Sequence, residues 1–326
     1  MKLSLGLLSP LLLALSGPAL GNGALASFPA GGVVFEDSAD IAIAQEDLIL
    51  SPGEVRVHYQ FFSSADETQS ATIGFPLPRV PSAPDEPDSV GAVTGSGGDR
   101  RNYLGFGIAV DGRPLIPILH EYAFLGDEDV TAQLLEAGLP LLPDFDTWEA
   151  WPRRLDPALV TSLFQAGLIS GEPGQYLNPR WDYQVVYEWV QDFAPGDTAV
   201  DIRYRPLMGW PNDFGDTYEI GATADSACVN DTLRAKLAAH KAQGDLYDVA
   251  QLDYITETAK HWHGPIGRFN LTIDTGTPDS WEGGYRDVLF ASCPVAATGL
   301  GDGQWGFTAT DYVPDRDVRV FFYLFN

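Results

Sequence analysis

Most of this chain alternates apolar and polar residues in short segments, which are separated by Gly, Pro, Asn and Asp. This period of two is typical of β-strands, whose successive side chains point to opposite faces of a sheet. The pattern predicts three hairpins before Gly244 and a second group of strands after it. The hairpins are 55–63 with 69–77, the two halves of 106–125 joined at Asp111-Gly112, and 185–193 with 198–207 across Pro195-Gly196. The later strands are 253–259, 267–275, 285–293, 304–313 and 317–325.

Three short helices are predicted between the strands. Each follows a residue that can cap a helix N-terminus and ends before a Gly. The expected helices are 130–137 after Asp129, 157–166 after Asp156 with Pro157 in the first position, and 232–242 after Asn230 or Asp231.

These elements predict a mainly β fold of two sandwich-like β units with a few short helices. The first unit is expected at 22–210, with a helical insertion at about 127–180, and the second at 211–326. Part of the insertion, 139–155, is rich in Pro and Trp and is either a lid or a cover over an open sheet edge. Residues 79–102 have few apolar side chains, so we expect a mobile loop there.

The first 21 residues read as a secretory signal peptide. Lys2 is followed by an apolar run from Leu3 to Leu15 and then by small residues. We expect cleavage after Gly21, with Ala24-Leu25-Ala26 as an alternative site. The apolar run is too short and too interrupted to cross a bilayer, and no later segment approaches about 18 apolar residues. The sequence therefore predicts a periplasmic or secreted protein without a transmembrane segment.

The chain is strongly acidic, with a formal net charge of -26 at pH 7. Nucleic-acid binding is excluded, because phosphate contacts need clustered Lys and Arg. The charge is explained by solubility in an exposed compartment, or by calcium bound to acidic loops such as 126–130 and 212–219. Neither loop has the spacing of an EF-hand. We therefore expect neither a metal nor another cofactor.

Two cysteines, Cys228 and Cys293, are separated by 65 residues. An even pair in an exported protein predicts one structural disulfide, which belongs to the second unit. Closing a loop of this length contributes about 4 kcal/mol in the chain-entropy model. A catalytic thiol is the competing interpretation, but an oxidising compartment argues against a persistent free thiol.

No local catalytic motif marks a reaction centre in this sequence. G-x-S-x-G, H-E-x-x-H, S-x-x-K and a phosphate loop are all missing from the printed chain. His261 and His263 lie two apart, so on a strand they share a face and could present two imidazoles to zinc. The alternative is a buried Trp262 between two solvated imidazoles. His58 and His120 fall within alternating strands, where half-buried histidines are ordinary.

One loop combines acidic and aromatic residues, which is typical of sugar-binding or sugar-cleaving sites. Such a loop is more often attached to the protein by its tryptophans while its acids face water. The residues are Asp144, Asp146, Trp148, Glu149 and Trp151.

Six segments, in order, resemble a bacterial family of signal-peptide-bearing proteins, domain of unknown function 4424. They begin at AGGVVFEDSADIAIAQEDLILSPGEVRVHYQF and FPLP and end at LDYITETAKHWHGPIGRFNLTID and DYVPDRDVRVFF. The resemblance marks the core Trp262-x-Gly264-Pro265-Ile266-Gly267 as recurrent and leaves His261 and His263 outside the pattern, which favours a structural tryptophan corner. The segment from about 53 to 210 is also similar to the VIT domain, a β-sandwich. Its motif Phe75, Pro76, Leu77 and Pro78 is expected to be structural.

Together these features predict a non-enzymatic binding or envelope-associated structural module. The partner is expected to be an envelope protein or ligand that the sequence does not identify. A periplasmic hydrolase and a calcium-dependent adhesion module are the alternatives.

Overall fold

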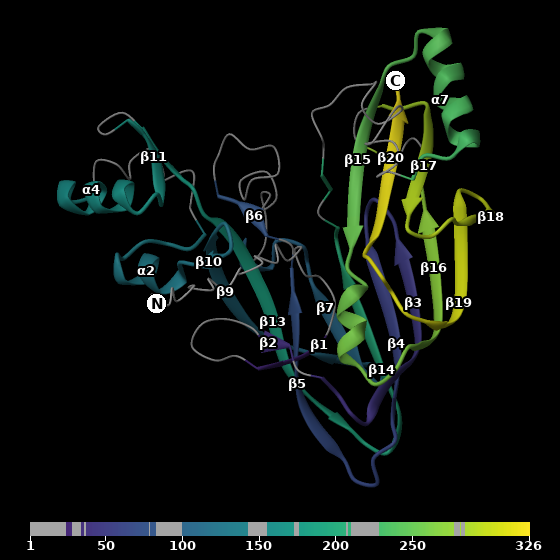
Figure 1. Ribbon diagram of the computed structural model, residues 1–326, viewed down its shortest axis with the longest axis horizontal. Coiled ribbons are helices and arrows are strands. Elements are labelled where there is room, and N and C mark those ends of the chain that lie inside the picture. Colours follow the sequence, from purple (N-terminus) through teal and green to yellow (C-terminus); the bar gives the residue numbers. More distant parts are fainter. Residues whose placement is uncertain are drawn as a thin grey trace, which may run out of the picture.

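The computed structural model describes residues 24–27, 34–35, 37–77, 79–82, 100–142, 155–172, 176–206, 208–209, 228–276, 281 and 284–326. Within these ranges the chain is mainly β, as the alternation predicts (Figure 1). Several predicted features lie outside the described residues: the leader, the acidic segment 212–219, most of the loop 79–102 and the acidic-aromatic loop. Among the described residues, no helix is long and apolar enough to cross a membrane.

The largest sheet has eight strands in the order β18-β19-β16-β3-β4-β14-β7-β8. All its pairs are antiparallel except β16 with β3, which is parallel. The strands are β3 (Ile41–Leu50), β4 (Val55–Ser63), β7 (Gly107–Val110), β8 (Arg113–Leu115), β14 (Gly196–Tyr204), β16 (Ile266–Asp274), β18 (Thr298–Gly301) and β19 (Gln304–Tyr312). Strands from both sides of residue 210 therefore share this sheet, so the expected boundary does not separate two sheets.

A second sheet has the order β10-β9-β13-β5-β1-β2, and β6 also pairs with β13. Its side chains share one hydrophobic core with the eight-stranded sheet. The strands are β1 (Ala24–Ser27), β2 (Val34–Phe35), β5 (Gln69–Pro76), β6 (Val80–Pro81), β9 (Ile118–Leu125), β10 (Glu128–Asp129) and β13 (Asp182–Phe193). A separate two-stranded sheet joins β11 (Ile169–Glu172) to β12 (Tyr176–Pro179).

A third sheet, in the order β15-β20-β17, is buried on both faces of its central strand. Its strands are β15 (Tyr247–Tyr254), β17 (Asp287–Cys293) and β20 (Val318–Phe325). Phe322 and Leu324 of β20 face the large core, whereas Phe321 and Tyr323 face helix α7 (Asp231–Gln243). Figure 1 shows α7 beside this sheet. Burial on both faces explains why β20 reads as a nearly continuous apolar run.

Helices α4 (Pro157–Gln165) and α7 begin where the sequence places their caps. Helix α2 (Thr131–Glu136) instead follows Val130, which makes no side-chain cap hydrogen bond, and not the expected cap Asp129. Helix α4 starts after Asp156, whose side chain accepts a hydrogen bond from the Ala158 N–H, 2.7 Å away. Helix α7 starts after Asn230 and ends at Gly244, which has a φ of 83°. The remaining helical elements are the 3-10 turns η1 (Arg100–Asn102) and η3 (Glu257–His261). The predicted helices are confirmed.

Two of the three predicted hairpins are wrong. Strand β4 pairs with β3 and β14, whereas β5 pairs with β13 and β1, so the short connection between β4 and β5 crosses from one sheet to the other. Strands β13 and β14 likewise lie in different sheets. Alternation indicates which face a strand buries but not which strand it pairs with. The turn at Asp111-Gly112 does join β7 to β8, with φ values of 47° and 74°. The rest of that predicted hairpin, β9, pairs with β13 in the second sheet.

Candidate functional site

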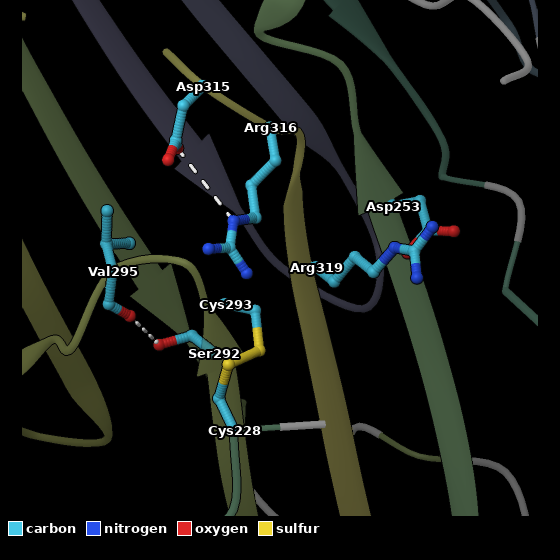
Figure 2. Close-up of a disulfide and its surroundings, with 8 residues drawn as sticks. All are labelled: Cys228, Asp253, Ser292, Cys293, Val295, Asp315, Arg316 and Arg319. Atoms are coloured by element: carbon cyan, nitrogen blue, oxygen red, sulfur yellow. Dashed lines mark hydrogen bonds and ion pairs between the residues drawn. A yellow bond between two sulfur atoms is a disulfide. The ribbon is translucent and has the colours of Figure 1, made fainter. Parts of the chain in front are cut away.

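A disulfide attaches the start of α7 to the end of β17, as the sequence predicts. Cys228 and Cys293 are bonded, with their Cα atoms 5.6 Å apart. Cys228 lies two residues before the helix cap Asn230, and Cys293 is the last residue of the strand. Figure 2 shows the bond between these two segments and, beside it, the Ser292 hydroxyl that donates to the Val295 carbonyl oxygen at 2.7 Å.

A groove of about 250 Å³ lies next to the disulfide. One wall is the first half of α7 and the other is β19 at Trp305, while β17 and the segment after it form the floor. The lining residues are Cys228, Asn230, Thr232, Leu233, Lys236, Val288, Leu289, Phe290, Ala291, Ser292, Pro294, Ala296, Ala297 and Trp305. We refer to this site as the α7–β17 groove.

The α7–β17 groove combines apolar surface with one positive charge. Phe290 and Trp305 are the two aromatic residues of the described lining, and their ring centroids are 5.0 Å apart in an edge-to-face arrangement. Lys236 is the one charged side chain among the described lining residues, and it is exposed. A site with apolar contacts and a few polar groups suits a ligand that is partly apolar and carries a negative charge.

The floor of the groove is the edge of a sheet. Strand β17 pairs with β20 on one side, and no other strand of the described chain pairs with its second side. Five consecutive residues of β17, 288–292, line the groove. An edge strand presents unpaired N–H and C=O groups to whatever lies beside it. The groove therefore offers main-chain hydrogen bonding as well as side-chain contacts.

A second chemically unusual group, Glu46, lies in the core. The Tyr254 hydroxyl donates to Glu46 Oε1 at 3.1 Å, and the Tyr59 and Tyr254 hydroxyls are hydrogen-bonded at 2.8 Å. Glu46 Oε2 has no hydrogen-bond partner among the described residues. Burial raises the pKa of Glu46 from its ordinary 4.5 to about 8, against the lowering effect of the hydrogen bond from Tyr254. The carboxyl group is therefore mostly protonated at neutral pH.

A β-bulge explains why a glutamate faces the core. The register between β3 and β4 shifts between Ile43 and Gln45, so Ala44 is an extra residue and the strand changes face there. Ile41 and Ile43 are buried before the bulge, whereas Glu46, Leu48 and Leu50 are buried after it. Glu46 is 0% exposed, so a ligand in solution cannot reach it and we assign it to the core.

The bulge needs a close contact with β16. A Cβ at Gly267 would lie 2.7 Å from the Ala44 carbonyl oxygen, a separation that real Cβ atoms essentially never show. Gly267 therefore lets the two backbones approach where β16 pairs with β3.

The tryptophan corner and the FPLP motif lie at opposite ends of the β5–β13 pair. Trp262 is 3% exposed, and its ring lies 4.6 Å from Phe61 and 6.0 Å from Phe193. His261 Nδ1 is 2.8 Å from an oxygen of Asp37. Among the described residues, no group of three or more metal-ligating side chains is present. The structural role proposed for Trp262, Gly264 and Pro265 stays a prediction.

The FPLP motif lies in the core at the end of β5. Phe75 is fully buried, with its ring 5.0 Å from Phe106 and 5.7 Å from Tyr204. The N–H of Leu77 donates to the Val185 carbonyl oxygen at 2.8 Å. Pro76 is also buried, and Pro78 lies outside the described residues. A structural role for this motif likewise stays a prediction.

The sequence predicted the disulfide of this site but not the groove or Glu46. The groove joins segments near 230, 290, 296 and 305, and no local pattern marks them as neighbours. Glu46 had no clear signal in the sequence either, because Ala42, Ala44 and Ile49 are apolar as well. The change of buried positions from odd to even shows only in the structure, at the bulge.

Comparison with known proteins places the chain in one family. No curated protein matches it. Among solved structures, it is similar to the crystal structure of a candidate nutrient-binding protein from Legionella pneumophila subsp. pneumophila str. Philadelphia 1. The two chains are 12% identical and superpose with a TM-score of 0.43. The similarity covers 93% of this chain and 70% of that chain. The similarity to VIT domains stays a prediction. Residues 21–321 match the family model described as "Domain of unknown function (DUF4424)", and the chain therefore belongs to that family.

Proposed function

We propose that this protein is an exported, non-enzymatic binding module that holds its partner in the α7–β17 groove. Export is supported by the predicted leader and by the disulfide, since disulfides persist in oxidising compartments. The observation that carries the proposal is the composition of the groove. It places an open strand edge, the apolar pair Phe290 and Trp305, and the exposed charge of Lys236 within one site.

The groove is also held in a defined shape, which favours binding. The disulfide fixes the start of α7, and the N-cap bond from the Leu233 N–H to Asn230 Oδ1 (2.8 Å) orders its first turn. The bond from Ser292 to the Val295 carbonyl oxygen orders the segment after β17. A preformed site loses less conformational entropy when a ligand binds than a flexible one does.

Selection from a random octapeptide display library against the chain from Asn22 onward tests this function. The best peptides are then synthesised with a fluorescent label, and their Kd is measured by polarisation. In the variant Ala296→Trp an indole replaces an exposed methyl group of the groove, so we expect affinity to fall at least about tenfold, or about 1.4 kcal/mol. Ala239→Trp, at an exposed position of α7 outside the groove lining, is the matched control and should bind like the wild type.

Two results would contradict the proposal. One is a library selection that enriches no peptide. The other is a set of enriched peptides whose Kd is the same for Ala296→Trp and Ala239→Trp, which would place binding elsewhere on the molecule.

A further inference from the structure

The main-chain groups of β17 alternate between its partner strand and the groove. Asn326 directly follows β20 and Leu246 directly precedes β15. The Asn326 N–H donates to the Leu246 carbonyl oxygen at 3.2 Å, so the main-chain groups of Asn326 point toward β15. Its neighbour Phe325 therefore points the other way, toward its register partner Asp287 on β17. By the same alternation Val288, Phe290 and Ser292 direct their N–H and C=O groups away from β20 and into the groove.

One of these three positions is already occupied. The Val288 N–H donates to the Asp287 carboxylate of the same strand at 2.9 Å. This local bond protects the first outward position of the edge, as charged side chains commonly do at sheet edges. For Phe290 and Ser292, no main-chain hydrogen bond on the groove side is formed within the described chain. Two adjacent outward positions are thus open for a partner strand.

The two walls of the groove have different chemistry. Leu289 and Ala291 of β17 face α7, whereas Val288 and Phe290 face the large core and Trp305. A strand laid against this edge would alternate its side chains in the same way. Its residues on the α7 side would approach Lys236, and those on the opposite side would pack on the indole of Trp305.

We propose that the groove binds an extended peptide segment that adds to the β15-β20-β17 sheet as a fourth strand next to β17. The segment carries a carboxylate on the face toward Lys236 and apolar side chains on the face toward Trp305. Five lining residues of β17 span about 17 Å at about 3.3 Å each, so the bound segment has about five or six residues. This inference rests on the proposed function and names the conformation and chemistry of the partner.

Charge complementarity supports this choice of partner. The whole chain carries a formal net charge of -26, so an acidic peptide is repelled by most of its surface. Lys236 provides an attractive charge at the groove, where strand addition supplies main-chain hydrogen bonds and side-chain pockets supply specificity. An acidic residue next to apolar ones is therefore selected at this place and disfavoured elsewhere.

The probe is the tightest synthetic octapeptide from the display selection described above. Amide hydrogen exchange is measured by NMR on the full mature chain, with and without this peptide. We expect the amides of Phe290 and Ser292 to exchange at least about tenfold more slowly when the peptide is bound, because new main-chain bonds protect them. The amides of Leu289 and Ala291 already face β20 and serve as internal controls that change little.

Two further variants test the strand and the charge. Two versions of the peptide are made, one N-methylated at its odd-numbered residues and the other at its even-numbered residues. One version should bind at least about tenfold more weakly and the other should bind almost normally, since only one set of peptide N–H groups faces β17. Lys236→Gln should weaken an acidic peptide about three- to tenfold and should not weaken the same peptide with Gln in place of its acid. Lys241→Gln, on α7 outside the groove lining, is the control.

The outcomes separate this inference from the proposed function. If Ala296→Trp abolishes binding but exchange at Phe290 and Ser292 is unchanged, or both N-methylated versions are tolerated, the groove binds a partner and strand addition is wrong. If the amides are protected but Lys236→Gln has no effect on an acidic peptide, the acidic partner is wrong. If no peptide is enriched, both proposals fail.

Discussion

Replacing Glu46 by Gln should make the protein more stable at neutral and mildly alkaline pH. The wild-type carboxyl group has a pKa of about 8 in the folded protein, raised from 4.5 by burial. Gln has almost the same shape, never ionises, and keeps an oxygen that can accept the hydrogen bond from Tyr254. The substitution therefore removes the cost of ionising a buried acid with little change in packing.

The magnitude follows from proton linkage. Between pH 4.5 and pH 8 the folded protein keeps the Glu46 proton while the unfolded chain releases it, so the wild type loses stability as the pH rises through this window. The two pKa values differ by about 3.5, and each pKa unit corresponds to about 1.4 kcal/mol, which gives about 5 kcal/mol in total. We expect the advantage of Glu46→Gln to be near zero at pH 4.5, about 3 kcal/mol at pH 7 and about 5 kcal/mol above pH 8.

Urea unfolding followed by circular dichroism at half-unit steps from pH 4.5 to pH 9 measures this difference. The free energy of unfolding of each protein is plotted against pH, and the informative quantity is the difference between the two curves. Glu67→Gln is the matched control, because Glu67 is exposed and the same change of charge there should give a curve that runs close to the wild type. Parallel curves for Glu46→Gln and the wild type would refute the reasoning, since they would mean that Glu46 releases its proton at the same pH folded and unfolded.

Three further changes test the rest of the structure by urea unfolding. Cys228→Ser with Cys293→Ser should lower the free energy of unfolding by about 2 to 5 kcal/mol, and a loss below about 1 kcal/mol would contradict a stabilising disulfide. Gly267→Ala should cost about 1 to 3 kcal/mol, because its Cβ would collide with the Ala44 carbonyl oxygen; unchanged stability would mean that the bulge can move aside. Trp262→Ala should lower the free energy of unfolding by about 3 to 5 kcal/mol, because it leaves a cavity in the core. Trp262→Phe leaves a smaller cavity and should lower it less, so a larger loss for Trp262→Phe than for Trp262→Ala would contradict this reasoning.

Local features of the sequence predicted local structure well. Asp156 and Asn230 cap the helices that follow them, and Asp111-Gly112 forms the tight turn, because each of these effects depends on neighbours within a few residues. The pairing of strands depends on residues far apart in the chain. Parallel pairing of β16 with β3 joins two segments more than 200 residues apart, and alternation within each strand contains no information about that partner.

The candidate site shows the same division between local and distant information. The disulfide could be predicted because only two cysteines exist and the leader indicates an oxidising compartment. The burial of Glu46 could not be predicted from β3, because Ala42, Ala44 and Ile49 are apolar too and hide the shift of buried positions from odd to even. The groove could not be predicted either, because its properties come from the side of β17 that pairs with no strand of the described chain and from the position of Trp305 on another sheet.

An open strand edge beside apolar side chains is a risk for aggregation. Within the described chain β17 is such an edge, so we ask what limits its pairing with other sheets. Asp287 protects one end of the edge, α7 stands along one side of it, and Trp305 stands along the other. A second sheet that approached β17 would bring neighbouring strands into the space of these walls. A single extended segment has no such neighbours and can enter between them. The arrangement therefore disfavours sheet-to-sheet association and is compatible with the single peptide strand that we propose.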